Sequence, residues 1–276
     1  MNKRIIGFDS GFDVINRPIQ ENFMSEKGPG EFPIEKRGKK TLGILAPYYS
    51  YRVSNAAWAY KEIAESFLPE SYVILGRKSG RGFSTFLFSD WETPLGLIKT
   101  NKKYGSLLIK EYPQLKNDFD AFNRHQVIDV QLPWLQFANR KQLTEVKFVP
   151  ILVGDVNYEE ICEFADSFVG ENICIIGSAH LTCYGKEYGF VPFVHAIKNN
   201  LYLLDRALLD LICALDTKGF LELGKKNNVF DRNVIALEME VMRNLGCKKG
   251  IVLNHSTSGD FEGYEHSVGF GAVVFR

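Results

Sequence analysis

The stretch that decides the fold runs from Val146 to Ser178 and reads VKFVPILVGDVNYEEICEFADSFVGENICIIGS. It opens with a long apolar run at 146–154, as expected of a buried strand. Residues 158–169 are predicted to form a helix, and 172–178 form a second short apolar run. Apolar strands that alternate with amphipathic helices predict a mostly parallel sheet that is covered by helices on both faces.

The same alternation extends along most of the chain. Residues 41–47 form a short apolar run, and 54–68 follow with apolar residues on one side of a helix. Residues 1–40 combine Gly, Pro and charged residues without apolar periodicity, which predicts an irregular N-terminal arm before a single α/β domain at 41–276. Further strands are predicted at 71–76, 93–100, 249–255 and 267–275, and further helices at 131–143, 191–215 and 233–246.

The composition is that of a soluble globular protein. Hydrophobic residues make up 45% and charged residues 24% of the 276 residues, and the formal net charge is zero. A neutral chain argues against duplex nucleic acid as a partner. No apolar run approaches the roughly 20 residues that span a bilayer, so no membrane association is expected. The five cysteines have no paired spacing, which favours a reducing, cytoplasmic compartment.

Several polar side chains follow the predicted strands directly. In sheets of this kind, ligands collect beyond the carboxyl ends of the strands. The segment 43–51 reads GILAPYYSY and places Tyr48, Tyr49 and Tyr51 directly after the first strand of the domain. The other side chains expected at this edge include Ser79, His180, Cys183, His255 and Asp260.

These residue types allow more than one chemistry. His180 and His255, with Asp260 or Asp129, would form a two-histidine, one-carboxylate iron site. Cys183 lies three residues after His180 and would form a nucleophile–base pair with it. Both alternatives stay open. A chain with five histidines offers many two-histidine, one-carboxylate combinations, and no third residue that would orient a Cys183–His180 pair is evident from the sequence.

Two further segments have a functional and a structural interpretation. His125 and Asp129 are four residues apart, on one helical face or in one loop, where a structural hydrogen bond is the alternative to a site. Residues 76–82 read GRKSGRG, which has the composition of an anion-binding loop but not the glycine spacing of a nucleotide site. A solvated turn is the alternative for that segment.

Seven segments follow one another along the domain: ILAPYYSYRVSNAAWAY at 44–60, VILGRKSG at 73–80, WETPLG at 91–96, DVQLPWLQ at 129–136, FVPILVGD at 148–155, GSAHLTCYG at 177–185 and HSTSGDFEGYEHSVGFGAVVF at 255–275. Taken in order, they resemble the Memo family, also called protein B of the AmmeMemoRadiSam system. The family fold is similar to that of class III extradiol dioxygenases, which carry non-haem iron, and its members are described as binding copper or iron. The resemblance implies this fold, iron or copper as cofactor, and a radical SAM protein with its companion domain as partners. Zinc is the further candidate, because thiolate and imidazole ligands together suit it.

The sequence departs from the family pattern where the family carries histidines. Tyr48 replaces the histidine of Ala-Pro-His, and Ser79 replaces that of Pro-Ser-His. In GSAHLTCYG, His180 stands where aspartate is usual and Cys183 where histidine is usual. Gln131 replaces the histidine before Leu-Pro. The outline of a pocket is therefore retained while most of its imidazoles are gone.

The sequence leads to two hypotheses about function. The first is a divergent Memo-like protein that has lost the metal chemistry and binds a small molecule or a protein partner. The second is a metal-dependent redox or dioxygenase-like enzyme with a shifted ligand set, for which His180, Cys183 and Asp260 are the predicted ligands. The predicted pocket comprises Tyr48, Tyr51, Ser79, His125, Asp129, Gln131, His180, Cys183, His255 and Asp260.

Overall fold

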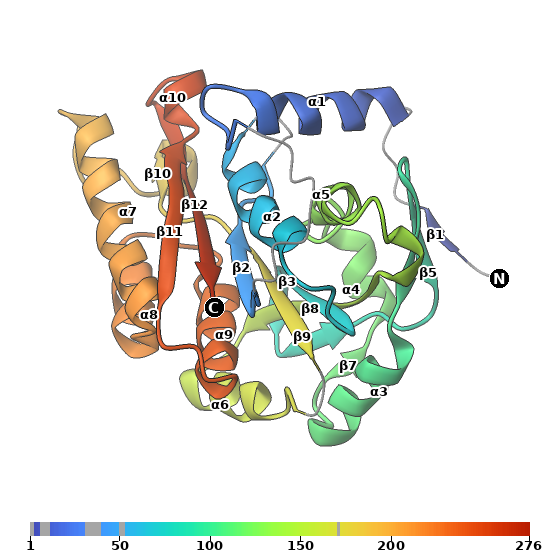
Figure 1. Cartoon of the computed structure of the whole chain (residues 1–276). Coiled ribbons are helices and arrows are strands. Elements are labelled where there is room, and N and C mark those ends of the chain that lie inside the picture. The colour runs from blue at the N-terminus through green and yellow to red at the C-terminus, as the bar shows by residue number, and fades with distance from the viewer. Residues whose placement is uncertain (1–2, 6–11, 31–39, 50–52, 170–171) are drawn as a thin grey trace.

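The structure is a computed structural model that describes residues 3–5, 12–30, 40–49, 53–169 and 172–276. Five neighbouring parallel strands form the centre of one twisted sheet (Figure 1). In spatial order they are β6 (Gly96–Thr100), β8 (Lys147–Asp155), β3 (Ser71–Arg81), β9 (Ile173–Ser178) and β2 (Gly43–Ala46). The prediction of a single α/β domain around a mostly parallel sheet is confirmed.

Antiparallel pairing extends the sheet at both sides of this centre. β12 pairs antiparallel with β2 and also with β10 and β11, while β5 forms a hairpin with β6. β1 pairs with β5, and the short β4 joins β8 to β7. These strands are β1 (Lys3–Ile5), β4 (Phe83–Thr85), β5 (Asp90–Thr93), β7 (Lys116–Asn117), β10 (Cys183–Gly185), β11 (Gly250–Thr257) and β12 (His266–Phe275).

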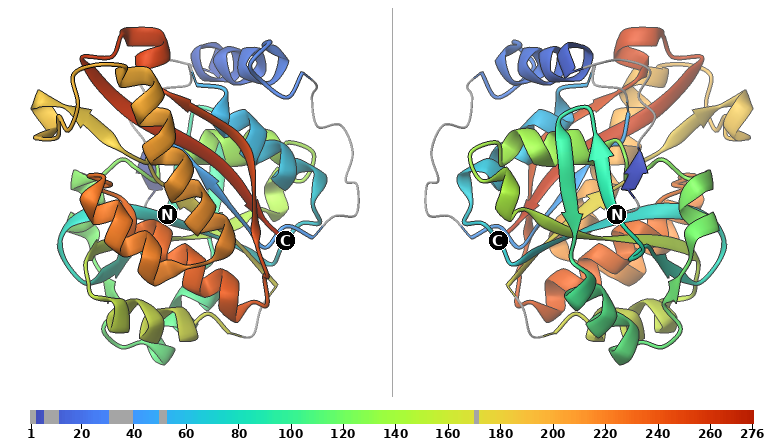
Figure 2. Two further views of the ribbon diagram at one scale, coloured as in Figure 1. Left: turned by 90° about the vertical axis from the view of Figure 1, so that its left-hand side faces the viewer. Right: turned by 90° about the vertical axis from the view of Figure 1, so that its right-hand side faces the viewer.

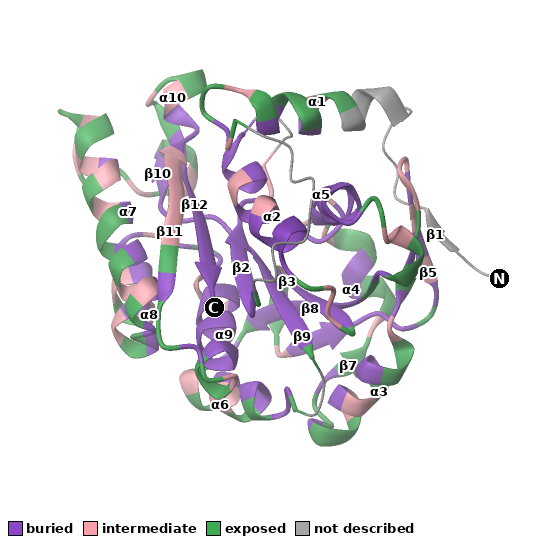
Figure 3. Ribbon diagram, in the orientation of Figure 1, coloured by how far each residue is buried: buried purple, intermediate pink, exposed green. Residues whose placement is uncertain are grey.

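Helices cover both faces of the sheet, because the central strands are apolar on both sides. In β3, Val73 and Leu75 pack into one core, and Tyr72 and Ile74 into the core on the opposite face. The two layers are seen from the side in Figure 2, and the buried strands between them in Figure 3. On the first face lie α3 (Lys102–Glu111), α6 (Tyr158–Asp166), α7 (Ile197–Ala214), α8 (Thr217–Lys226) and α9 (Arg232–Asn244), and on the second α1 (Phe12–Met24), α2 (Asn55–Glu65), α4 (Phe119–Arg124) and α5 (Gln131–Ala138).

Three short helices complete the described secondary structure. They are η1 (Leu143–Glu145), η2 (Lys186–Tyr188) and α10 (Gly259–Glu262). None of the helices in the described ranges is long and apolar enough to cross a membrane.

The N-terminal segment differs from the prediction of an irregular arm. Residues 12–24 form α1, with Ile19 and Phe23 buried one helical turn apart. The helix contains Pro18, a residue that argues against a helix interior when only the sequence is considered. Residues 31–39 of the predicted arm lie outside the described residues.

Several predicted elements have different boundaries in the structure, and for two of them the backbone angles give the reason. Residues 93–100, predicted as one strand, contain the turn of the β5–β6 hairpin, and Gly96 adopts a positive φ of 110° there. The helix predicted to span 191–215 begins only at Ile197. Ala196 has a φ of 48°, a left-handed conformation that cannot continue a right-handed helix.

Candidate functional site

Tyr48 and His180 meet at the carboxyl edge of the sheet, as the strand register requires. β2 and β9 are parallel neighbours with Ala46 opposite Ser178. Tyr48 and His180 each lie two residues beyond these positions, and their rings stack with centroids 3.8 Å apart and an interplanar angle of 24°. Two strand ends predicted from the sequence to converge are therefore in direct contact.

The carboxylate of Asp231 connects this ring pair to a third strand end. The backbone N–H of His180 donates to Asp231 Oδ2 at 2.8 Å, and the Tyr48 hydroxyl donates to Oδ1 at 3.5 Å. Arg77 Nε, just beyond the buried part of β3, lies 3.1 Å from the same Oδ1 as an ion pair. We call Tyr48, Arg77, His180 and Asp231 the Asp231 cluster.

Asp231 is the residue that the sequence interpretation missed. It stands directly before α9, a position where an aspartate normally caps its own helix. Its side chain makes no such cap and points instead to residues 51 and more positions away in the chain. With only 1% of its surface exposed, it is a buried carboxylate that accepts a hydrogen bond from the His180 backbone and forms an ion pair with Arg77.

Burial holds the side chains of Tyr48, His180 and Cys183 in their neutral forms. Burial, assisted by the charge of Arg77, lowers the pKa of His180 to about 3. Burial and the neighbouring Asp231 raise the pKa of the Tyr48 phenol and bring the pKa of Cys183 to about 12. At neutral pH the cluster therefore holds a neutral imidazole and a phenol around the Arg77–Asp231 ion pair, and the nearby Cys183 is a protonated thiol.

Asp260 belongs to a different polar group. Its Oδ1 accepts from Tyr264 at 2.5 Å and lies 2.9 Å from Lys198 Nζ, and its Oδ2 accepts from Tyr202 at 2.7 Å. Burial alone would raise the pKa of Asp260, but these hydrogen bonds lower it well below its ordinary value. Both carboxylate oxygens are thus occupied by groups of the chain.

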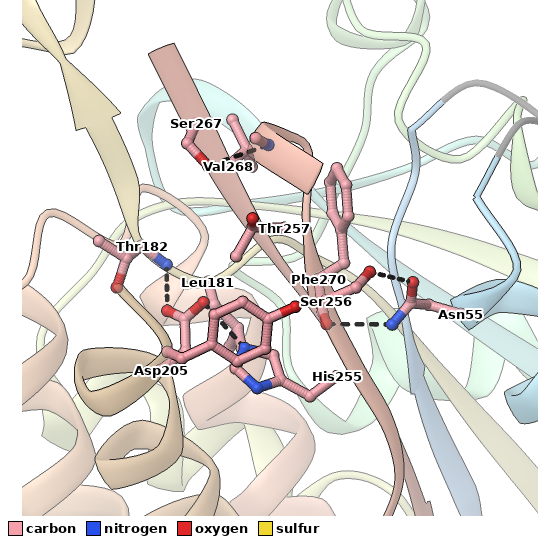
Figure 4. Close-up of polar contacts among 12 residues, drawn as sticks. Asn55, Leu181, Thr182, Asp205, His255, Ser256, Thr257, Ser267, Val268 and Phe270 are labelled. Carbon is pink, nitrogen blue, oxygen red and sulfur yellow. Dashed lines mark hydrogen bonds and ion pairs between the residues drawn. The ribbon is translucent and has the colours of Figure 1, made fainter. Parts of the chain in front are cut away.

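His255 lies beside this second group and is oriented by a buried carboxylate. Its Nε2 is 3.1 Å from Asp205 Oδ2, while Asp205 Oδ1 accepts the backbone N–H of Thr182 at 3.1 Å (Figure 4). The ring of Tyr202 packs against His255 with centroids 4.8 Å apart. The His255–Asp205 pair joins β11 to α7, and Asp205 is a second buried acid that the sequence did not indicate.

Gln131 is a structural support behind Tyr48 and His180. Its buried side chain donates to the Pro47 carbonyl at 3.1 Å and to Ser178 Oγ at 2.9 Å, and it accepts from Tyr60 at 2.9 Å. These contacts fix the residues that immediately precede the stacked rings. Gln131 therefore positions the strand ends by tying them to α5.

The remaining predicted residues lie around this edge or outside the described chain. The Ser79 backbone N–H donates to His125 Nε2 at 3.3 Å, which joins two of the candidates in an exposed contact. Burial, with the nearby charge of Arg77, lowers the pKa of His125. Asp129 is buried just before α5. Tyr51 lies outside the described residues.

This protein is therefore an α/β protein with a mixed, mostly parallel sheet and a polar cluster at the carboxyl edge of that sheet. The family pattern described as Memo-like protein matches residues 13–274, and the chain belongs to this family. The match begins inside α1, so the helix missed by the sequence interpretation is part of the shared domain.

Archaeal relatives support the same family along nearly their whole length. A MEMO1 family protein of Methanopyrus kandleri is 31% identical over 96% of this chain and 94% of its own length. Similar proteins of Pyrobaculum aerophilum and Nitrosopumilus maritimus are 26% and 28% identical, over 97% and 95% of this chain and 95% and 92% of their own lengths.

The side chains at the positions where the resemblance implies histidines do not fit an imidazole metal site. Tyr48 and Cys183 would need to ionise to bind a metal, and burial raises the pKa of both. Within the described ranges, no three His, Cys, Asp or Glu side chains are placed to hold a metal ion. His180, Cys183 and Asp260, the predicted ligand set, are accordingly not brought together as one.

Proposed function

We propose that this Memo-family chain binds a small molecule at the carboxyl edge of its sheet, beside the Asp231 cluster. The observation that carries the proposal is the position of Arg77. One side of its guanidinium is held by buried Asp231, while 43% of the side chain stays exposed. Arg77 therefore connects a fixed, buried polar cluster to solvent, as a residue that orients a ligand would.

A pocket opens where Arg77 emerges. We call it the rim pocket, and its volume of about 300 Å³ is at the lower end of the range found for small-molecule sites. Strand ends of β3 and β8 and the start of α9 form its walls. Its lining includes Arg77, Lys78, Asp155, Phe230 and Arg232.

The protonation states of His180 and Cys183 support binding over acid–base chemistry. A general base works best with a pKa near the working pH, whereas the pKa of His180 is about 3. Cys183, with a pKa of about 12, holds almost no thiolate at neutral pH. Neither side chain lines the rim pocket, so the Asp231 cluster meets a ligand there through Arg77.

A thermal-shift screen of small metabolites tests this proposal, because a ligand that binds the native state raises the melting temperature. Hits are expected with the wild type and should be lost or weakened in Arg77→Gln. Arg81→Gln is the matched control, because Arg81 lies on the same strand but pairs with Glu160 at 3.1 Å. An absence of hits, or hits that both variants keep equally, would contradict the proposal.

A second candidate is a metal-dependent redox enzyme with a shifted ligand set. The observation in its favour is His180 Nε2, which is buried and has no hydrogen-bond partner in the described structure. Metal analysis of untagged protein separates the two candidates. Stoichiometric iron, copper or zinc that is lost in His180→Phe would favour the enzyme.

Two further proposals follow from family analogy and from the cysteines. We propose a radical SAM protein and its companion domain as partners, which co-purification of tagged protein would test. We also propose a cytoplasmic location, since all five cysteines are free and a reducing compartment keeps thiols in that state.

A further inference from the structure

We infer that the ligand of the rim pocket is a small organic anion that carries a phosphate or carboxylate group and an apolar body. This inference rests on the proposed binding function and specifies its ligand.

The rim pocket has more positive than negative side chains. Arg77, Lys78 and Arg232 line it, against the single carboxylate of Asp155. Arg77 is partly neutralised by Asp231 behind it, at 3.1 Å. The positive potential for a ligand therefore comes mainly from Lys78 and Arg232.

Lys78 and Arg232 hydrogen-bond to backbone carbonyls, and the charge of the Asp118 carboxylate also acts on Lys78. Lys78 Nζ donates to the Arg81 carbonyl at 2.9 Å, and Arg232 Nη1 donates to the Val229 carbonyl at 3.3 Å. Neither residue forms an ion pair with any residue that the structure describes. Each keeps further N–H donors for an anion, and an arginine can offer two parallel donors to a phosphate or carboxylate.

A second cationic pocket shows why charge alone does not define the site. This larger pocket, about 560 Å³ in volume, is lined by Asp216, Lys218, Arg243 and Lys248 among others. Arg243 is already bound by both oxygens of Glu240, at 3.1 and 3.2 Å. This pocket lies between the end of α9 and the start of α8, where Asp216 caps that helix, so the two helix dipoles oppose each other there. The rim pocket lies at the start of α9, where the dipole adds to the positive charge.

Phe230 supplies the apolar part of the rim pocket. Its side chain is 40% exposed, and the guanidinium of Arg77 lies 5.7 Å from the ring centroid. An exposed ring next to cationic donors suits a ligand that joins an anionic group to a flat or aliphatic body. A free inorganic anion would leave this ring uncovered.

Calorimetric titration with three probes tests the ligand class. Phenyl phosphate carries both features, inorganic phosphate only the anion, and benzyl alcohol only the ring. Phenyl phosphate is expected to bind more tightly than either of the others, with an affinity that falls as salt is added. Equal binding of phenyl phosphate and benzyl alcohol would overturn the inference.

Variants locate the binding. Arg232→Gln should weaken phenyl phosphate about tenfold, the size expected for one lost hydrogen bond to a charged group. Phe230→Ala should weaken phenyl phosphate but leave inorganic phosphate unchanged. Lys248→Gln, in the other cationic pocket, is the matched control and should change neither. If Lys248→Gln weakens binding and Arg232→Gln does not, the site is wrongly placed.

The outcomes separate this inference from the function on which it rests. If uncharged hits from the metabolite screen require Arg77 while phenyl phosphate does not bind, the ligand class is wrong and the binding function stands. If neither kind of compound binds, both fail.

Discussion

The carboxylate of Glu238 on α9 lies against the backbone of Gly177 on β9, whose N–H donates to Glu238 Oε1 at 3.3 Å. A β-carbon at position 177 would lie 2.0 Å from Oε2, so only glycine leaves room for the acid. Oε2 itself is buried and has no partner within the described chain. The helix therefore carries an acid into the core below the Asp231 cluster.

Glu238→Gln is expected to stabilise the protein at neutral pH. Burial raises the pKa of Glu238 well above its ordinary value, so its contribution to stability is complete below about pH 4.5 and is lost as the pH rises towards the folded-state pKa. Glutamine does not titrate and keeps an oxygen for the Gly177 N–H. The advantage of the variant should grow by about 1.4 kcal/mol per pH unit in that window. Urea unfolding at pH 4.5, 6 and 8 measures it, and a pH-independent difference would contradict the expectation.

His180 should make the protein sensitive to acid. Its pKa is about 3 in the folded state against an ordinary value of 6.5, so its stabilising contribution is present above pH 6.5 and is lost as the pH falls towards 3. His180→Phe retains a ring against Tyr48 and should flatten the stability profile between these limits. His266→Gln, which removes an exposed imidazole 3.5 Å from Glu187, is the control for the loss of a histidine. A wild-type slope in His180→Phe would assign the acid sensitivity to other groups.

Cys183 is expected to resist alkylation in the native protein. With a pKa of about 12, roughly one thiol in ten thousand is ionised at pH 8, and the side chain is buried. Cys162, which is half-buried, is the internal reference and should react faster. Iodoacetamide labelling followed by peptide mass spectrometry gives both rates. Faster labelling of Cys183 would revive the nucleophile–base hypothesis for His180 and Cys183.

The sequence predicts the fold well because the central strands are short apolar runs that alternate with amphipathic helices. The elements that the sequence analysis missed are those in which proline or glycine interrupts this pattern. Pro18 hides α1, and Pro94 with Gly96 turns an apparent strand into a hairpin. Such breaks depend on a few backbone angles and tertiary contacts, which override local propensity.

The sequence locates the site only where strand ends determine it. Tyr48 and His180 directly follow neighbouring strands, so their contact is predictable from parallel pairing. Asp231 precedes a helix and meets His180 across 51 positions, a relationship that no local pattern contains. Asp260 also follows a strand, but α7 supplies the partners Tyr202 and Lys198 that engage it separately.

The ring of Tyr48, more than its hydroxyl, should stabilise the edge of the sheet. Its hydroxyl reaches Asp231 Oδ1 only at 3.5 Å, so Tyr48→Phe should cost less than about 1 kcal/mol of unfolding free energy. Tyr48→Ala also removes the stack on His180 and should cost about 2 kcal/mol, less than the deletion of a fully buried aromatic side chain because Tyr48 is half-buried. Tyr49→Phe, which loses an exposed hydrogen bond to Glu262 of 2.7 Å, is the matched control for loss of a phenol. Urea unfolding compares the three variants. If Tyr48→Phe lowers the unfolding free energy as much as Tyr48→Ala, the hydroxyl supplies most of the stabilisation by Tyr48. Its hydrogen bond to Asp231 is then stronger than the 3.5 Å distance indicates.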